Sequence, residues 1–166
     1  MLYSHTVPNK RIIHGDIVVY NCPLPDILEE VHGMLIGLDN YQYPLPKGLR
    51  YIGGNRLKLS GYNWSLPDTL EAVGGTVYCQ YYKYPLPENL KYICGSLHVT
   101  EYKFPIPKNL KVIGEHLLLQ KHPYPIPDTL EDVLGYVSPV LYEYKIPERF
   151  TPWTVEAIHE INNRFS

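Results

Sequence analysis

Hydrophobic residues recur along the chain with a period of about 20 residues. An aliphatic residue followed by proline opens each copy, and successive copies are 21, 21, 20, 20, 20 and 20 residues apart. Counting that aliphatic residue as position 0, the shared unit reads LPxxLxx[VI]xGxLxLxxYx[YFW]P. The seven copies begin at Leu24, Leu45, Leu66, Leu86, Ile106, Ile126 and Ile146, and a shorter copy lies at Val7-Pro8. A fixed period of this length predicts a solenoid, in which each unit stacks on the next.

Each unit contains one stretch with the periodicity of a strand. At positions 11 and 13 aliphatic residues alternate with polar ones, as in Leu97-His98-Val99, and this period of two gives a short strand with one buried face. Because a single strand cannot bury that face alone, neighbouring units must pair their strands in a parallel sheet. The prolines at positions 1 and 19 lack an amide N–H and belong on the opposite side of each coil. The pattern predicts an α/β or mostly β repeat solenoid with one short parallel strand per repeat.

The repeats predict a single solenoid domain over residues 1–166 with a cap at its C-terminal end. After the last copy the pattern changes, and Thr151 as N-cap followed by Pro152 predicts an amphipathic helix over residues 152–164. Such a helix would cover the core of the last repeat, as solenoids require. The expected parts are a truncated N-terminal coil at 7–23, about six repeats at 24–150 and the helical cap at 151–166.

The same unit predicts which side chains fill the coils. Aliphatic residues at positions 0, 4, 7, 11 and 13 and the aromatic residue at position 18 are expected inside, where burial stabilises each coil. Position 16 is left open between a buried and an exposed location. In the two 21-residue units we place the extra residue between the glycine and the strand, so that the inward residues are Ile36 and Leu38 in the first unit, and Leu57 and Leu59 in the second.

With the repeat aligned, residues 7–150 resemble leucine-rich repeat proteins. The common unit of that family, LxxLxLxxNxLxxLPxxLxxL, has the same order as [VI]xGxLxLxxYxYPLPxxLxxI here. The LPxxL half is similar to the short, about 20-residue repeats of effectors that bacterial pathogens inject into host cells. The IxGxL half is similar to the repeats of receptor L domains. The resemblance implies a curved, right-handed solenoid that binds proteins through its parallel sheet, without catalysis by the repeats.

One departure from that family concerns the residue that ties adjacent coils together. The family uses an asparagine, whose side chain bonds to the backbone. The corresponding residues here are Tyr41, Tyr62, Tyr82, Tyr102, His122 and Tyr142. We expect tyrosine not to make the same compact backbone bonds, and the curvature of the solenoid to differ for that reason.

The net charge limits the classes of binding partner, and the cysteine content bears on the cellular compartment. With 15 basic and 17 acidic residues the formal net charge is -2, which argues against a nucleic-acid or anionic-membrane partner. Charges on the proline side alternate between coils, as at Glu29, Arg50 and Glu71, and are expected to help set the register. Three cysteines without a CxxC pair favour a reducing compartment. Without a signal-peptide pattern we expect a cytoplasmic protein, with delivery into a host cell left open.

Catalytic and cofactor motifs are missing from the sequence. It has no G-x-S-x-G, Walker or HExxH motif and no Cys/His cluster with metal-ligand spacing. His98 and His116 are expected on neighbouring strands, but no third ligand is evident. We therefore expect no enzymatic activity, no cofactor and no metal site.

The variable residues lie at positions 10, 12 and 14, which should face outward from the sheet. Tyrosine, leucine and arginine at these positions are typical of interface cores, with threonine, serine and glutamine around them. Ordinary solvated strand residues are the alternative, since tyrosine and threonine favour strands. The candidate partner-binding residues are Arg56, Lys58, Thr76, Tyr78, Gln80, Ser96, His98, Thr100, His116, Leu118, Gln120 and Tyr136.

The function expected from these features is that of a non-enzymatic module for protein–protein interaction. A narrower hypothesis is a pathogen or phage protein that inhibits or sequesters a host factor. Two alternatives stay open. One is a small-ligand binder that uses the aromatic strand face for a nucleotide or carbohydrate, and the other is a structural module that assembles with copies of itself.

Overall fold

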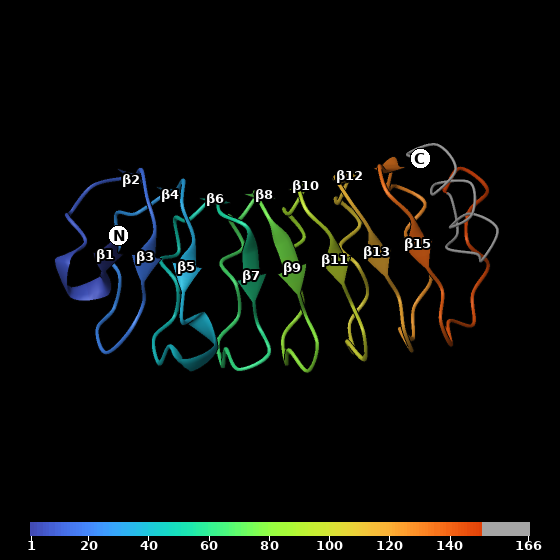
Figure 1. The fold of residues 1–166 in the computed structure, drawn as a ribbon, viewed down its shortest axis with the longest axis horizontal. Helices are drawn as coiled ribbons and strands as arrows, with labels where there is room; N and C mark the ends of the chain where they lie inside the picture. The colour runs from blue at the N-terminus through green and yellow to red at the C-terminus, as the bar shows by residue number, and fades with distance from the viewer. Residues whose placement is uncertain (151–166) are drawn as a thin grey trace, which may run out of the picture.

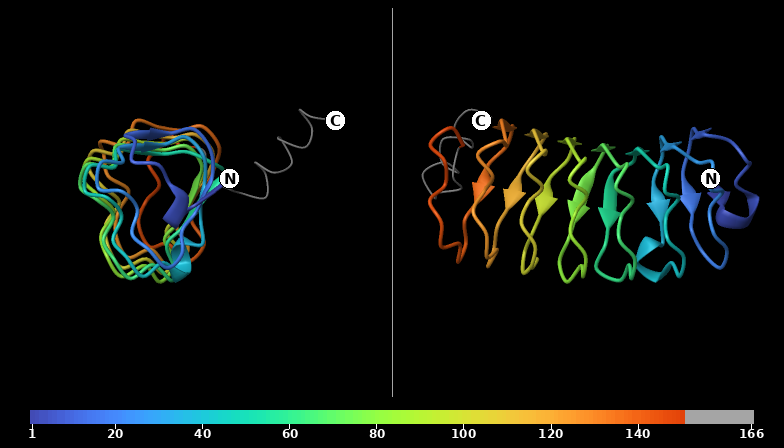
Figure 2. Two further views of the ribbon diagram at one scale, coloured as in Figure 1. Left: turned by 90° about the vertical axis from the view of Figure 1, so that its left-hand side faces the viewer. Right: turned by 180° about the vertical axis from the view of Figure 1, so that it is seen from behind.

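A computed structural model describes residues 1–150 of the chain. Over these residues the chain winds into a mostly β, parallel solenoid of about six turns (Figure 1). Viewed along the long axis, successive coils superimpose closely and enclose one continuous interior (Figure 2). The prediction of a repeat solenoid is therefore confirmed. The helix predicted over residues 152–164 lies outside the described residues.

Each complete coil contributes two short strands, so the prediction of one strand per repeat is wrong. The unpredicted strands end at the [VI] of position 7 and pair in parallel along the whole solenoid. They form a seven-stranded sheet: β2 (Ile12–Ile13), β4 (Glu30–Val31), β6 (Tyr51–Ile52), β8 (Ala72–Val73), β10 (Tyr92–Ile93), β12 (Val112–Ile113) and β14 (Asp132–Val133). Each of these strands has a single inward residue, at position 7, so no alternation of apolar and polar residues marks it in the sequence.

The predicted strands at positions 10 to 12 form the second side of the coils, but they are divided between two sheets. A three-stranded sheet contains β1 (Leu2–Tyr3), β3 (Ile17–Val18) and β5 (Leu35–Ile36). A five-stranded sheet contains β7 (Arg56–Lys58), β9 (Thr76–Tyr78), β11 (Leu97–His98), β13 (Leu117–Leu118) and β15 (Val137–Ser138). Two short 3-10 helices, η1 (Ser4–Thr6) and η2 (Leu38–Asn40), follow β1 and β5. The side chains of the two rows of strands meet between them in a single core.

The predicted aliphatic positions fill this core. Leucine at position 4 is fully buried in the complete coils, as at Leu70, Leu90 and Leu110. In the five-stranded sheet the inward residues of neighbouring strands are paired directly, for example Leu97 with Leu117. Each repeat thus buries the same apolar set against its neighbours, and the ladder of main-chain bonds holds those sets in register.

The aromatic positions are reversed relative to the prediction for position 18. The residues at position 16 are the buried ones: Tyr41, Tyr62, Tyr82, Tyr102 and His122. At position 18, Trp64, Tyr124 and Tyr144 are 43%, 37% and 43% exposed. Tyr43, Tyr84 and Phe104 are partly buried and pack against the edge of the core. Several position 18 rings bond to the preceding coil, as where Trp64 Nε1 donates to the carbonyl oxygen of Gln42 at 3.1 Å. The prediction that position 18 belongs to the core is wrong in that none of these residues is buried, although three of them pack against the core.

The buried tyrosines make backbone hydrogen bonds between coils, contrary to the expectation that they would not replace the asparagine. The hydroxyl of Tyr62 accepts from the amide of Leu45 at 2.8 Å and donates to the carbonyl of Tyr43 at 3.4 Å. The same pair of bonds recurs at Tyr41, Tyr82, Tyr102 and Tyr142. The longer side chain reaches the backbone from inside the coil, and burial raises the pKa of Tyr41 to about 12.

His122 occupies the same position in the next coil without making these bonds. It is buried, and neither of its ring nitrogens has a hydrogen-bond partner. Its ring lies parallel to that of Tyr102, with 6.2 Å between the ring centroids. Burial lowers the pKa of His122 to about 4 because a charged imidazole would lose its hydration there.

The extra residue of the first 21-residue unit lies after the inward strand residue and not before it. Leu35 pairs with Ile17 and is buried, whereas Ile36 is only partly buried. The inserted residue is Gly37, whose φ of 86° lies in the left-handed region and precedes η2. The assignment of Ile36 as inward and Leu35 as outward is therefore wrong. In the second unit Leu57 and Leu59 are both buried, as predicted.

Candidate functional site

The outer face of the five-stranded sheet brings most of the predicted binding residues together. Lys58 pairs with Tyr78, Tyr78 with His98, and His98 with Leu118, so position 12 forms one continuous row. Arg56 pairs with Thr76 at the start of a second row, which follows position 10. The remaining members of the position 10 row are Ser96, His116 and Tyr136. We call these two rows the strand face.

Hydrogen bonds connect the position 10 row from coil to coil. The Thr76 hydroxyl oxygen accepts from the amide of Ser96 at 3.1 Å, and the Ser96 hydroxyl oxygen accepts from the amide of His116 at 3.2 Å. Nδ1 of His116 in turn accepts from the amide of Tyr136 at 3.2 Å. Ser96 also donates to a carboxylate oxygen of Glu115 at 3.0 Å and is buried. Ser96 therefore supports the face from beneath, and the neighbouring side chains form its surface.

Two pairs of stacked or tilted rings form the aromatic part of the strand face. The rings of Tyr78 and His98 have centroids 4.4 Å apart and are tilted by 39°. Those of His116 and Tyr136 have centroids 3.9 Å apart and are stacked at 24°. Burial and the neighbouring His116 both lower the pKa of His98, so this imidazole is neutral at pH 7. The rings thus hold one another in place before any partner arrives.

Arg56 and Lys58 supply the charge of the strand face at its N-terminal end. Both side chains are exposed, and neither forms an ion pair or a side-chain hydrogen bond within residues 1–150. Some other cations of the solenoid are paired, for example Lys91 with Glu71 at 3.1 Å and Lys121 with Glu101 at 3.1 Å. Two adjacent unpaired cations are therefore available for an external anion.

The remaining predicted residues lie apart from the two rows. Gln80, Thr100 and Gln120 follow the last residues of their strands, and Gln80 and Gln120 are exposed. Within the described part of the chain their side chains make no hydrogen bond to the rest of the strand face. They border this face at one end.

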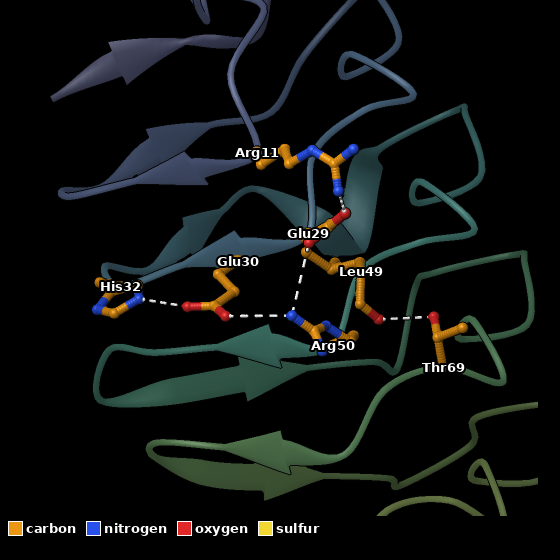
Figure 3. Close-up of polar contacts among 7 residues, drawn as sticks. All are labelled: Arg11, Glu29, Glu30, His32, Leu49, Arg50 and Thr69. Atoms are coloured by element: carbon orange, nitrogen blue, oxygen red, sulfur yellow. Dashed lines mark hydrogen bonds and ion pairs between the residues drawn. The ribbon is translucent and has the colours of Figure 1, made fainter.

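Charges on the proline side form ion pairs between coils, as expected for Glu29 and Arg50 (Figure 3), whereas Glu71 pairs with Lys91 and not with Arg50. Arg50 lies 3.5 Å from a carboxylate oxygen of Glu29 and 3.7 Å from one of Glu30, and Arg11 binds Glu29 from the other side. His32 contacts the second oxygen of Glu30 at 2.8 Å. Such partly exposed pairs contribute about 0.2 to 1 kcal/mol each. The charged groups of this cluster are paired with one another, so none of them is available to bind a ligand.

Sequence reasoning missed two contributors to the site. Glu115 accepts the Ser96 hydroxyl and is not on a predicted binding position. Residues 34–39 border Arg56 and Lys58, because the chain makes an extra turn there. The additional residue of the first 21-residue unit is the signal that could have indicated that turn.

Comparison with known proteins yields no relative. No family model matches the chain, and no curated protein or solved structure matches it. The resemblance to leucine-rich repeat proteins rests on the repeat pattern. Within residues 1–150 there is no helix with the length and apolar character needed to cross a membrane, and no group of three or more His, Cys, Asp or Glu residues placed to bind a metal ion.

Proposed function

We propose that this protein is a non-enzymatic binding module of the leucine-rich repeat type, and that it binds another protein through the strand face. The observation that carries the proposal is the pair of ring contacts, Tyr78 with His98 and His116 with Tyr136, on a hydrogen-bonded row. A row of partly exposed rings beside free cations has the composition of a protein interface core.

Rigidity is the physical reason why this face suits a protein partner. A flexible surface loses side-chain freedom on binding, at roughly 0.5 to 1.5 kcal/mol for each immobilised side chain. Here the rings of the strand face are already packed, and the imidazole of His116 is held by the amide of Tyr136. The neutral state of His98 lets its ring be covered without the cost of burying a charge. A flat partner surface can therefore dock with little reorganisation.

The narrower role that we propose is sequestration of a host factor by a pathogen or phage protein. It draws on the LPxxL repeats, which are similar to those of injected bacterial effectors. A scaffold without catalytic motifs acts on a partner by occupying its surface.

Affinity capture followed by mass spectrometry tests the proposal. The wild-type chain is compared with a variant that combines Tyr78→Ala and His98→Ala, and with a control variant that combines Tyr92→Ala and Lys103→Ala on other exposed surfaces. We expect one or more proteins to be retained by the wild type and the control but lost from the strand-face variant. Equal recovery by all three folded proteins would refute the strand face as the binding surface.

A further inference from the structure

The two sheets on the second side of the coils are separated at one junction. Strand β5 is hydrogen-bonded to β3 and β7 to β9, but β5 and β7 are not hydrogen-bonded to each other. On the other side of the same coils β4 and β6 remain paired. The separation coincides with Gly37 and the short helix η2, which lies beside β7 near the end of the coil (Figure 1). The inserted residue thus opens the ladder at a single place.

A cavity of about 270 Å³ lies at this junction, and we call it the junction pocket. Ile36 gives it an accessible apolar wall, with the buried Leu35 and Leu38 behind it, and Arg56 and Lys58 border it from β7. Its size suits one or two side chains of a protein and not a larger cofactor. Because Lys58 and Tyr78 are paired residues of adjacent strands, the pocket adjoins the strand face directly.

The charges around the junction pocket select for a single negative charge. Arg56 and Lys58 contribute two positive charges and Asp39 one negative charge, which leaves a net charge of +1. None of the three forms an ion pair within the described residues. A monoanion neutralises this set, whereas a phosphate dianion would leave excess negative charge beside Asp39.

We propose that the junction pocket receives a carboxylate of the protein partner together with an adjoining aliphatic side chain. This inference rests on the proposed function, and it specifies the chemistry of the partner. The guanidinium of Arg56 can bind both carboxylate oxygens, Lys58 adds a second donor, and the partly exposed side chain of Ile36 contacts the aliphatic group. The rest of the partner segment would continue across Tyr78.

A matched pair of small probes tests this inference with the intact chain. N-acetyl-leucine carries a free carboxylate beside a leucine side chain. In N-acetyl-leucinamide a neutral amide replaces this carboxylate, and the rest of the molecule is the same. In an amide NMR titration at constant ionic strength, we expect the acid to shift the resonances of residues 34–39 and 56–58 saturably. The amide should bind about tenfold more weakly, because a charge-assisted hydrogen bond is lost. Equal shifts from both probes, or no shifts at the pocket, would overturn the inference.

Variants assign the effect to the two cations. Arg56→Gln and Lys58→Gln should each weaken binding of N-acetyl-leucine several-fold, and Lys103→Gln, on a distant exposed lysine, should leave it unchanged. Thermal unfolding of each variant checks that the fold is retained. If inorganic phosphate displaces the probe more effectively than free N-acetyl-leucine does, the pocket is a phosphate site and the inference is wrong.

The failure of this inference can be separated from failure of the proposed function. If the partner is lost with Tyr78→Ala and His98→Ala but the probes do not bind, the strand face stands and the pocket does not receive a carboxylate. If the acidic probe binds selectively but the strand-face variant still retains every captured protein, the pocket is supported and the proposed function is refuted.

Discussion

The hydroxyl oxygen of Tyr102 accepts a hydrogen bond from the backbone amide of Leu86, 2.7 Å away at the start of the same repeat unit. The same hydroxyl donates to the carbonyl oxygen of Tyr84 at 3.2 Å. The ring is fully buried, and its burial raises the pKa of the phenol well above the usual range. One side chain therefore fills the core and also satisfies two main-chain groups that no strand ladder reaches.

Removal of this hydroxyl should destabilise the solenoid more than the loss of an average hydrogen bond. The variant Tyr102→Phe keeps the ring but leaves the amide of Leu86 without its partner in a buried site. We expect the free energy of unfolding to fall by about 1 to 3 kcal/mol, measured by urea denaturation. The control is Tyr92→Phe, since Tyr92 is 49% exposed and makes no side-chain hydrogen bond in the described structure. Equal effects of the two changes would contradict the role of the buried hydroxyl.

A tyrosine at position 122 should stabilise the protein. His122 is the buried member of the position 16 series that lacks the two backbone bonds, and the amide at the start of its repeat unit is that of Ile106. In His122→Tyr the hydroxyl can reach this amide as Tyr102 reaches that of Leu86. We expect a gain of about 1 kcal/mol in the free energy of unfolding. His122→Phe restores ring volume without a hydroxyl, and a gain of the same size there would show that hydrogen bonding is not the cause.

Stability should fall in mild acid because of His122. Its pKa is lowered from 6.5 to about 4 in the folded state, so the unfolded chain binds the proton more readily. The contribution of neutral His122 is fully present above pH 6.5 and decreases as the pH falls towards 4, with a loss of about 2 kcal/mol by pH 5. Urea denaturation at several pH values checks this. His122→Phe should show a flatter profile between pH 7 and 5, and an unchanged profile would assign the acid sensitivity elsewhere.

The turns after the strands contain four residues other than glycine with positive φ, namely Tyr81, Glu101, Lys121 and Leu141. At Leu141, with φ of 53°, the left-handed backbone costs roughly 1 to 2 kcal/mol for a residue with a Cβ atom. Leu141→Gly removes that cost and incurs an entropic cost of about 0.5 to 1 kcal/mol. We expect a small net gain in stability. Leu134 is equally exposed at 67% but has no positive φ, so Leu134→Gly should destabilise the protein in the same thermal unfolding assay.

The repeat pattern predicts most of the core because apolar spacing directly reflects burial. Leu70 and Leu97 represent two positions of the unit that are aliphatic in successive repeats. A residue at such a position has equivalent neighbours in every coil. The outward rows are predictable for the same reason, since Lys58, Tyr78 and His98 share one position of the unit. The pattern therefore predicts which residues of neighbouring coils lie side by side.

The pattern does not reveal which of two aromatic residues points inward. Tyr82 and Tyr84 are two residues apart and share the same chemistry, but only Tyr82 is buried, because its hydroxyl finds an amide inside the coil. The hydroxyl of Tyr84 instead donates to the carbonyl of Asn63 at the surface. The choice depends on hydrogen-bond geometry between coils, which a hydrophobicity pattern does not contain. The junction pocket was missed for a related reason, since the location of one inserted residue depends on whether Gly37 adopts a positive φ.

The separation of β5 from β7 also has a consequence for folding cooperativity. In a repeat protein each coil is stabilised by its own packing and by its interfaces with adjacent coils. Most neighbouring coils share two ladders, but at this junction only the ladder between β4 and β6 crosses. This interface is therefore more weakly coupled than the interfaces with two ladders, and it divides the solenoid into two units that can open at different free energies. Amide hydrogens of the three-stranded sheet should accordingly exchange as one group, earlier than those of the five-stranded sheet.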